Sequence, residues 1–432
     1  MSLKHMIRVL LAVSLVVSLS SVKGQNYFPP NESGSWETVD MDWCDDSIDT
    51  LLSYLEVRNT KSFIILKDGR IAMEEYFNDH EESTFWYWAS AGKTLSATLV
   101  GVAQEEGALE LSDPVNQFLG EGWTSCSLEE ETERTIWHQL TMSSSFDNNP
   151  FLWDCTEPAC FLCTGVEPGT EWHYHNGVYR LLLDVVEEAT GTSRNIYTNQ
   201  KIEDIIGMNG FWSENLYWSN ARSMARFGLL ALNDFNWNGT PVLTDSDYIQ
   251  ALTTPSQEMN QAYGYLWWLN GQESFMLPLD ETVYTGSLIP SAPDDMYAAL
   301  GANDQKIYVV PSQNLVVIRQ GNEAYEENPA LSGFDFELWQ LISGLDCDPL
   351  SSPNEGGDEN KLHFYPNPST GKISTSLLDI KKLRVYSKTG RLIDEIEHPG
   401  KHLKLSLQPG VYYLKAEMET EEIVQRLIIL SK

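Results

Sequence analysis

Three side chains stand at spacings that could create an activated nucleophile. Ser90 and Lys93 form an S-x-x-K pattern, which places a hydroxyl and an amine one turn apart on the same face of a helix. The amine can take the hydroxyl proton if burial keeps it partly neutral. Tyr174 begins a Y-x-N pattern that ends at Asn176, and a phenol there could pass the proton to a leaving group. Hydrolysis of an ester or amide at neutral pH needs an activated nucleophile of this kind.

Each of these patterns recurs elsewhere in the chain, so their context matters. S-x-x-K also begins at Ser20, within the predicted N-terminal signal peptide, and at Ser369, on a predicted turn. Only Ser90 follows an aromatic stretch and begins a predicted amphipathic helix, whose N-terminus would stabilise negative charge near the hydroxyl. Tyr174 lies between a Pro-Gly turn and a predicted helix, a place from which a side chain can reach a cleft. The alternatives are a serine that only caps a core helix and a structural tyrosine.

The elements that would position these residues show mixed periodicity. Residues 62–66 and 71–77 predict a hairpin around the turn 67–70, and residues 91–107 and 177–190 predict helices. Two further strand-like runs lie near 296–319. Strands at both ends with helices between them predict an α+β domain whose sheet gathers both chain ends.

The charge of the 432-residue chain is −34, with 28 basic and 62 acidic side chains. The acidity lies between residues 25 and 360, since residues 361–432 carry 12 basic and 8 acidic groups. This balance argues against nucleic acid as a partner and against docking on anionic lipid. A solvated acidic surface suits a salty or extracellular medium, and attraction of cationic ligands is the alternative.

Residues 1–24 are predicted to be a secretory signal peptide, with basic residues, an apolar run and small residues near the cleavage point. The run is short for a bilayer span, so we expect no stable membrane span after cleavage. Six cysteines, an even number in an exported chain, predict disulfides of unknown pairing. Cys155, Cys160 and Cys163 with the distant Cys347 also match an iron–sulfur spacing, but export disfavours a cluster. We predict no metal and no cofactor.

Composition and periodicity divide the chain into four segments: the signal peptide 1–24, the α+β domain 25–347, a flexible linker 348–360 rich in Pro, Ser and Gly, and a small all-β sandwich 361–432. The last segment resembles the type A sorting domain of the type IX secretion system, through residues 364–369, 385–390, 409–414 and 428–430. That resemblance implies a bacterial protein delivered outside the cell or to its surface by the type IX machinery.

Residues 25–345 resemble the β-lactamase-related serine hydrolases, a group that includes class C β-lactamases, D-alanyl-D-alanine peptidases, esterases and 6-aminohexanoate-dimer hydrolase, the last being the most similar. The segments that carry the resemblance are 88–94, 138–142, 168–170, 299–305, 308–311 and 315–319. It implies a β-lactamase/DD-peptidase-like α+β fold, with an antiparallel sheet flanked by helices and a helical subdomain.

The resemblance also implies roles for individual residues. Ser90 would attack the acyl carbon, Lys93 would act as the base, and Tyr174 would protonate the leaving group. The backbone N–H groups of Ser90 and Ala302, next to Gly301, would bind the oxyanion. Asn176 would contact the substrate or orient Lys93.

The chain departs from the penicillin-recognising relatives at their third motif, Lys-Thr-Gly or His-Thr-Gly. The matching stretch is Ala299-Leu300-Gly301, so the cation that would meet a substrate carboxylate is absent. Asp304 is expected at the rim of the site. A small neutral or cationic ester or amide is therefore the predicted substrate. A β-lactamase or D-alanyl-D-alanine peptidase, and a catalytically silent binding protein on the same fold, are the alternatives.

Overall fold

The computed structural model describes residues 26–31, 35–152, 154–325, 333–346, 364–365, 372–375, 380–387, 391–408, 410–418 and 422–429. The predicted signal peptide 1–24, the linker 348–360 and Cys347 lie outside the described residues.

A six-stranded antiparallel sheet forms the middle layer of the larger domain, with strand order β2-β1-β13-β12-β11-β8. The predicted hairpin is confirmed as β1 (Thr60–Lys67) and β2 (Arg70–Tyr76). Asp68 and Gly69 turn the chain with positive φ angles of 51° and 78°, which suits a tight hairpin turn. Because β1 pairs with β13, the sheet joins the two ends of the domain, as predicted.

The two strand-like runs near 296–319 are three strands, so that prediction was wrong in number. They are β11 (Tyr297–Gly301), β12 (Gln305–Val310) and β13 (Leu315–Gly321). The extra break falls at Asn303 and Asp304, which both have a φ of 58°. Asn and Asp tolerate the left-handed region better than most residues, so a polar pair inside an apolar run allows a turn there.

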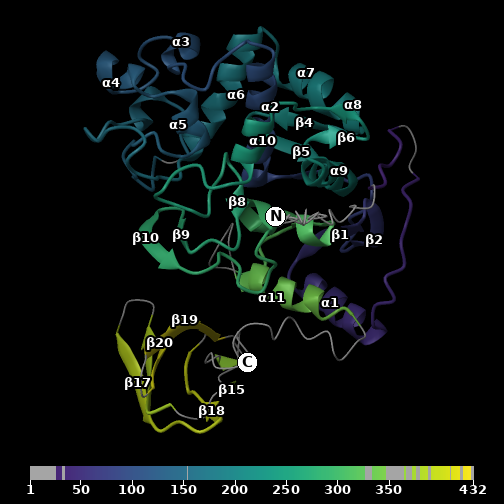
Figure 1. The fold of residues 1–432 in the computed structure, drawn as a ribbon, viewed down its shortest axis with the longest axis vertical. Coiled ribbons are helices and arrows are strands. Elements are labelled where there is room, and N and C mark those ends of the chain that lie inside the picture. Colours follow the sequence, from purple (N-terminus) through teal and green to yellow (C-terminus); the bar gives the residue numbers. More distant parts are fainter. Residues whose placement is uncertain are drawn as a thin grey trace, which may run out of the picture.

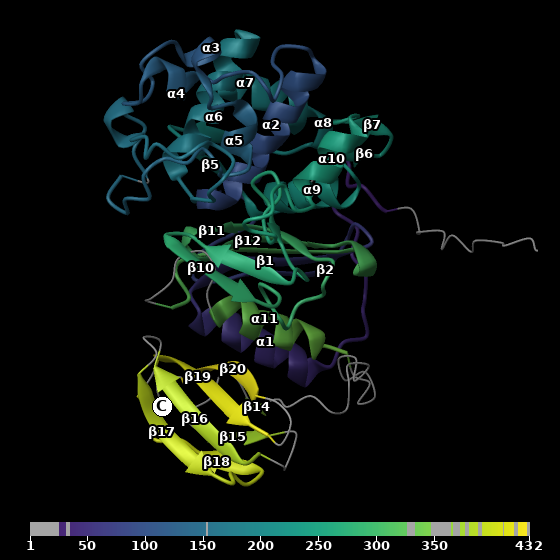
Figure 2. The ribbon, with the colours of Figure 1, turned by 60° about the vertical axis from the view of Figure 1, so that its left-hand side comes forward.

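Helices cover both faces of the sheet (Figure 2). On one face lie α1 (Asp45–Val57) and α11 (Gly333–Ser343), and on the other lies α9 (Ala221–Leu232). Beyond α9 lies a helical subdomain (Figures 1 and 2). Its helices are α2 (Lys93–Glu105), α3 (Asn116–Leu119), α4 (Leu128–Thr132), α5 (Ile136–Leu140), α6 (Asn176–Thr190), α7 (Arg194–Thr198), α8 (Asp204–Ile206) and α10 (Ser246–Leu252).

Short strands complete the larger domain. They are β3 (Trp86–Tyr87), β4 (Gly210–Ser213), β5 (Leu216–Ser219), β6 (Asn236–Trp237), β7 (Thr240–Pro241), β8 (Trp268–Leu269), β9 (Ser274–Leu277) and β10 (Asp280–Thr285).

Helix α2 is the central helix of the subdomain. The sequence predicted it as amphipathic, but every residue from Lys93 to Ala103 is buried. The helix packs against α6, and a Cβ on Gly101 would lie 2.4 Å from the ring of Tyr248 in α10. A helix enclosed on all sides keeps any polar side chain away from water, and Lys93 is one of those side chains.

The C-terminal residues form a separate all-β unit with its own apolar core (Figure 1). Its two sheets have the orders β14-β15-β18 and β17-β16-β19-β20, in agreement with the predicted small β-domain. The strands are β14 (Phe364–Tyr365), β15 (Lys372–Thr375), β16 (Lys382–Ser387), β17 (Leu392–Glu397), β18 (His402–Lys404), β19 (Gly410–Glu417) and β20 (Glu422–Ile429).

Disulfides account for Cys155, Cys160 and Cys163, the three cysteines of the cluster-like spacing that the structure describes. Cys126 is bonded to Cys163, and Cys155 is bonded to Cys160. Cys44 is disulfide-bonded as well. In the part of the chain that the structure describes, no helix is both long enough and apolar enough to cross a bilayer.

Candidate active site

Ser90 lies in a 3₁₀ turn, Ala89–Gly92, that leads directly into α2. Ala89 has a φ of 49°, an unfavourable value for a residue with a Cβ. The buried Trp88 holds this turn in place, since its backbone N–H donates to the carbonyl of Tyr217 at 2.8 Å. Its indole N–H donates to Ser219 Oγ, also at 2.8 Å. Strand β5 therefore fixes the position of the serine.

The amine of Lys93 joins Ser90 to Asn176. Lys93 Nζ lies 2.7 Å from Ser90 Oγ and 2.7 Å from Asn176 Oδ1. Ser90 and Lys93 come from one helical turn, whereas Asn176 is the first residue of α6, 83 residues later in the chain. The structure thus brings the predicted serine, lysine and asparagine within hydrogen-bonding distance.

Burial favours the neutral form of Lys93. Its side chain is enclosed by aromatic rings, with Nζ 4.0 Å from the ring centroid of Tyr179 and 4.6 Å from that of Tyr174. Loss of solvation holds the pKa of Lys93 well below its usual range; the Arg180 guanidinium lowers it further and the Asp154 carboxylate opposes the shift. An amine with a depressed pKa can accept the proton of an adjacent hydroxyl.

Tyr174 comes from the extended segment just before α6 and is buried, with 3% of its surface exposed. Its phenol is hydrogen-bonded to Ser90, and its ring stacks on Trp268 with centroids 6.0 Å apart. Burial raises the pKa of Tyr174 above its ordinary value, although the hydrogen bond to Ser90 opposes the shift. The phenol therefore keeps its proton at neutral pH and can donate it.

Helix α6 begins at the site because its preceding residue, His175, is still extended, and it ends where Gly191 adopts a left-handed conformation. This matches the predicted helix 177–190 within one residue.

Asn176 Nδ2 donates to Asp154 Oδ1 at 3.1 Å, and Arg180 Nη2 lies 2.8 Å from the same oxygen. Asp154 and Arg180 were not predicted from the sequence. The only available signal was Arg180 at i+4 from Asn176.

Gly301, at the end of β11, packs directly against the nucleophile turn. A Cβ on Gly301 would lie 2.4 Å from the carbonyl oxygen of Trp88 and 2.9 Å from the backbone nitrogen of Ala91. A glycine is therefore required for this approach. Ala302 follows at the start of a short turn beside the serine.

Two buried side chains hold the turn after Gly301. Gln305 Nε2 donates to the carbonyl of Asn303 at 2.9 Å, and Arg319 Nη1 donates to the same carbonyl at 2.9 Å. The side-chain amide of Asn303 in turn donates to the Tyr87 hydroxyl at 2.6 Å. These bonds fix the backbone around Ala302 relative to Ser90.

Asp304 does not lie at the rim, so that expectation was wrong. Its side chain is fully buried and pairs with Lys306 at 3.1 Å. Lys306 pairs with Asp335 as well, at 2.8 Å. A buried carboxylate needs such a partner. Lys306 follows on β12, and Asp335, which shares this lysine, comes from α11, a long-range contact that local sequence could not indicate.

His173 and His175, which flank Tyr174, lie in packed surroundings. His173 Nδ1 lies 3.0 Å from the carbonyl oxygen of Phe146, and the ring of His175 packs on Phe161 with centroids 5.2 Å apart. Burial lowers the pKa of His175 to about 4. Among the described residues, no group of three His, Cys, Asp or Glu side chains is placed to hold a metal ion.

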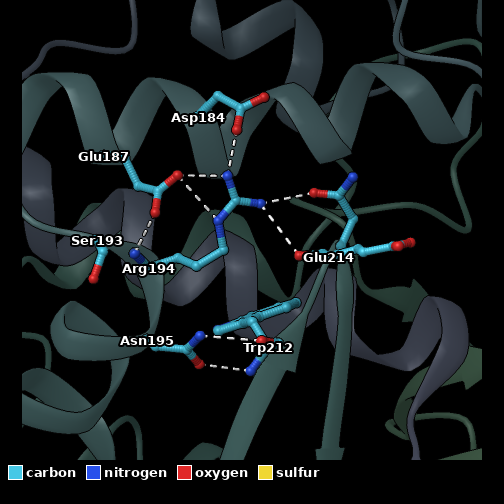
Figure 3. A pocket seen from close by; sticks show the side chains of 8 residues that line it. Asp184, Glu187, Ser193, Arg194, Asn195, Trp212 and Glu214 are labelled. Carbon is cyan, nitrogen blue, oxygen red and sulfur yellow. Dashed lines mark hydrogen bonds and ion pairs between the residues drawn. The ribbon is translucent and has the colours of Figure 1, made fainter.

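A surface pocket of about 440 Å³ lies beside the later part of α6 (Figure 3). Arg194 fills its centre and binds Asp184 and Glu187 as well as the Asn215 side chain. Asp184 is eight residues beyond Asn176 on the helix, about 12 Å along its axis. This pocket is therefore separate from Ser90, and its ion pairs support the α6–α7 corner.

The family model described as beta-lactamase matches residues 56–338, and the model described as secretion system C-terminal sorting domain matches residues 363–430. An uncharacterized protein of Alkalihalophilus pseudofirmus is 22% identical over 305 residues, which are 60% of this chain and 83% of that protein.

Solved structures show the same fold. A protein from Bacillus anthracis, provisionally assigned as a 6-aminohexanoate-dimer hydrolase, matches with a TM-score of 0.54 at 19% identity, over 74% of this chain and 87% of that one. The octameric penicillin-binding protein homologue of Pyrococcus abyssi matches with a TM-score of 0.53 at 13% identity, over 89% and 96%. At these identities the likeness concerns the fold alone.

Proposed function

Because this chain belongs to the β-lactamase family, we propose that it is a serine hydrolase that cleaves an ester or amide through an acyl-enzyme on Ser90. Its C-terminal sorting domain indicates type IX secretion, to the cell surface or the medium. The observation that carries the proposal is the position of Lys93 Nζ, 2.7 Å from both Ser90 Oγ and Asn176 Oδ1 in a buried site.

The acylation step follows from these contacts. Ser90 Oγ attacks the acyl carbon while its proton passes to the neutral amine of Lys93, and the carbonyl π-bond opens to an oxyanion. The N–H groups of Ser90 and Ala302 stabilise that oxyanion, and one such donor lowers the barrier by about 3 to 4 kcal/mol. The intermediate then expels the leaving group, which takes a proton from Tyr174, and the phenol regains one from Lys93.

Deacylation reverses these roles. Water attacks the acyl-serine ester, and its proton passes to the Lys93–Tyr174 pair. The same pair then returns a proton to Ser90 Oγ as the serine leaves. Tyr174 serves as the donor rather than as a standing phenolate, because burial keeps its proton in place at neutral pH.

The charges around the site favour substrates without a carboxylate. Ala299 occupies the position where penicillin-recognising relatives carry a cation. Lys306, which pairs with Leu300 across the sheet, is fully buried and bound to Asp304 and Asp335, so it does not replace that cation. The acidic chain would also repel an anionic substrate. We therefore favour neutral or cationic esters and amides over β-lactams and D-Ala-D-Ala peptides.

A substrate panel tests the proposal. Purified protein is assayed with p-nitrophenyl esters, amide oligomers, D-Ala-D-Ala peptides and nitrocefin, with Ser90→Ala as the matched control. We expect Ser90-dependent turnover of an ester or amide and negligible nitrocefin turnover. Rapid nitrocefin turnover would support the β-lactamase alternative, whereas the absence of any Ser90-dependent reaction would favour a binding protein.

A further inference from the structure

Asn176 is held between two groups of different chemistry. Its Oδ1 accepts from Lys93 Nζ at 2.7 Å, and its Nδ2 donates to Asp154 Oδ1 at 3.1 Å. A carboxylate only accepts hydrogen bonds, so Asp154 can face the NH₂ side of the amide but not its oxygen. The carboxylate thereby selects the amide orientation that presents Oδ1 to the amine.

Arg180 fixes the carboxylate in turn. It lies one turn after Asn176 on α6, and its Nη2 is 2.8 Å from Asp154 Oδ1. The guanidinium also donates to the backbone carbonyl of Asp154. The side chain of Asp154 is anchored on α6 although 56% of it is exposed.

The loop that carries Asp154 is fastened to the start of α6. Cys155, the next residue, is bonded to Cys160. A Cβ on Gly177 would lie 2.0 Å from the carbonyl oxygen of Cys155, so the loop backbone touches the helix one residue after Asn176. This contact sets where the carboxylate stands relative to the amide.

We propose that Asp154 is a positioning residue for the Ser90–Lys93 pair, and that it acts by orienting the side-chain amide of Asn176. The role rests on the proposed function and deepens it. Asp154 touches neither Ser90 nor Lys93 in any contact described above. Its effect passes through one amide, which must keep its oxygen toward the amine for Lys93 to point at the serine.

The electrostatics of the cluster give this role a distinctive signature. The groups around Lys93 are the phenols of Tyr174 and Tyr179, whose pKa values burial raises so that both stay neutral, and the charged pair Asp154 and Arg180. Asp154 raises the pKa of Lys93 and Arg180 lowers it. Removing one charge or the other should therefore shift the pH dependence of the serine in opposite directions.

The test measures the second-order rate constant for fluorophosphonate labelling of Ser90 in the full mature chain across pH. Asp154→Ala should lower the plateau rate about 10- to 100-fold, because a misplaced reacting group costs rates of that order. Asp154→Asn keeps an acceptor for Asn176 and should restore most of the plateau. The labelling rate should fall at acidic pH as Lys93 becomes protonated. In both Asp154 variants this fall should move to lower pH by about half a unit, and in Arg180→Gln it should move to higher pH.

Glu157→Gln is the matched control, since it removes a carboxylate at an exposed position three residues away, within the loop closed by Cys155 and Cys160. This variant should leave unchanged both the plateau rate and the pH at which labelling falls. If wild-type protein labels at Ser90 but Asp154→Ala keeps its plateau within twofold, the positioning role is overturned and the hydrolase proposal stands. If wild-type Ser90 does not label at all, the proposed function fails, and the role with it.

Discussion

In the proposed mechanism, the phenol of Tyr174 and the amine of Lys93 divide the proton transfers at Ser90. The pKa of Lys93 lies well below its usual range and that of Tyr174 above, both chiefly through burial. Groups whose pKa values are displaced in this way can act as base and acid at the same pH. In this mechanism Lys93 accepts the proton of Ser90, and Tyr174 donates a proton to the leaving group.

Tyr174→Phe tests that division. We expect kcat/KM to fall about 10²- to 10⁴-fold, the usual contribution of a positioned acid or base, with a larger loss for alkyl esters than for p-nitrophenyl esters. Tyr263→Phe is the matched control, because Tyr263 packs against Tyr174, with ring centroids 6.3 Å apart, and its buried hydroxyl has no hydrogen-bond partner among the described residues. Equal losses in both variants would contradict the role of the phenol.

His175 makes the fold sensitive to acid. Its pKa falls from 6.5 to about 4 through burial, so the unfolded chain binds an extra proton between these values. Stability contributed by the neutral ring is complete above pH 6.5 and declines as the pH falls toward 4, by at most about 3 kcal/mol. The free energy of unfolding in urea should therefore depend less on pH over that range in His175→Gln, whereas substitution of the exposed His402 by Gln should not change its pH dependence. An unchanged slope in His175→Gln would refute this cause.

Sequence patterns predicted the residues that meet at the site but not the residues that orient them. Two short motifs contain the predicted residues: Ser90 and Lys93 lie one helical turn apart, and Tyr174 and Asn176 form a pattern that the resembling family also has. Asp154 reaches Asn176 through the path of an irregular loop, and no periodicity predicts such a path. Asp304 was misplaced for a similar reason, because the lysine that pairs with it, Lys306, is also bound by Asp335 on the distant helix α11.

The candidate site lies where α2, α6 and β11 come together. The hairpin β1–β2 and helix α6 were predictable because alternation, turn residues and a terminal glycine agree there. The enclosure of α2 on all sides was not, since its stripe of large apolar residues resembled that of a surface helix. Small residues such as Gly101 allow neighbours to cover the remaining face.

The close approach of β11 to the nucleophile turn gives a prediction for Gly301. Gly301→Ala places a methyl group 2.4 Å from the Trp88 carbonyl, so strand and turn must separate and displace Ala302. We expect kcat/KM to fall at least about 100-fold, from misplacement of the oxyanion donors. Gly344→Ala, whose added methyl would meet nothing closer than 3.5 Å, should retain activity. Near-normal turnover by Gly301→Ala would contradict this placement.

Among the described residues there are two apolar cores, one in the larger domain and one in the C-terminal unit. Catalytic and sorting roles should therefore separate. The mature chain ending at residue 360 should keep kcat/KM within about twofold of the full mature chain, because each core is buried independently. The same truncation should abolish delivery to the surface or medium of a type IX-competent host. A folded but inactive truncation would show that the C-terminal unit contributes to the site.

Mass-spectrometric mapping of a fluorophosphonate adduct shows whether Ser90 is the reactive nucleophile. We expect folded wild-type protein to acquire one adduct, on the peptide containing Ser90, and Ser90→Ala to acquire none. Lys93→Ala should label at least about 100-fold more slowly, since the serine loses its base. An unmodified Ser90 in folded protein, or an adduct on another serine that persists in Ser90→Ala, would contradict the account.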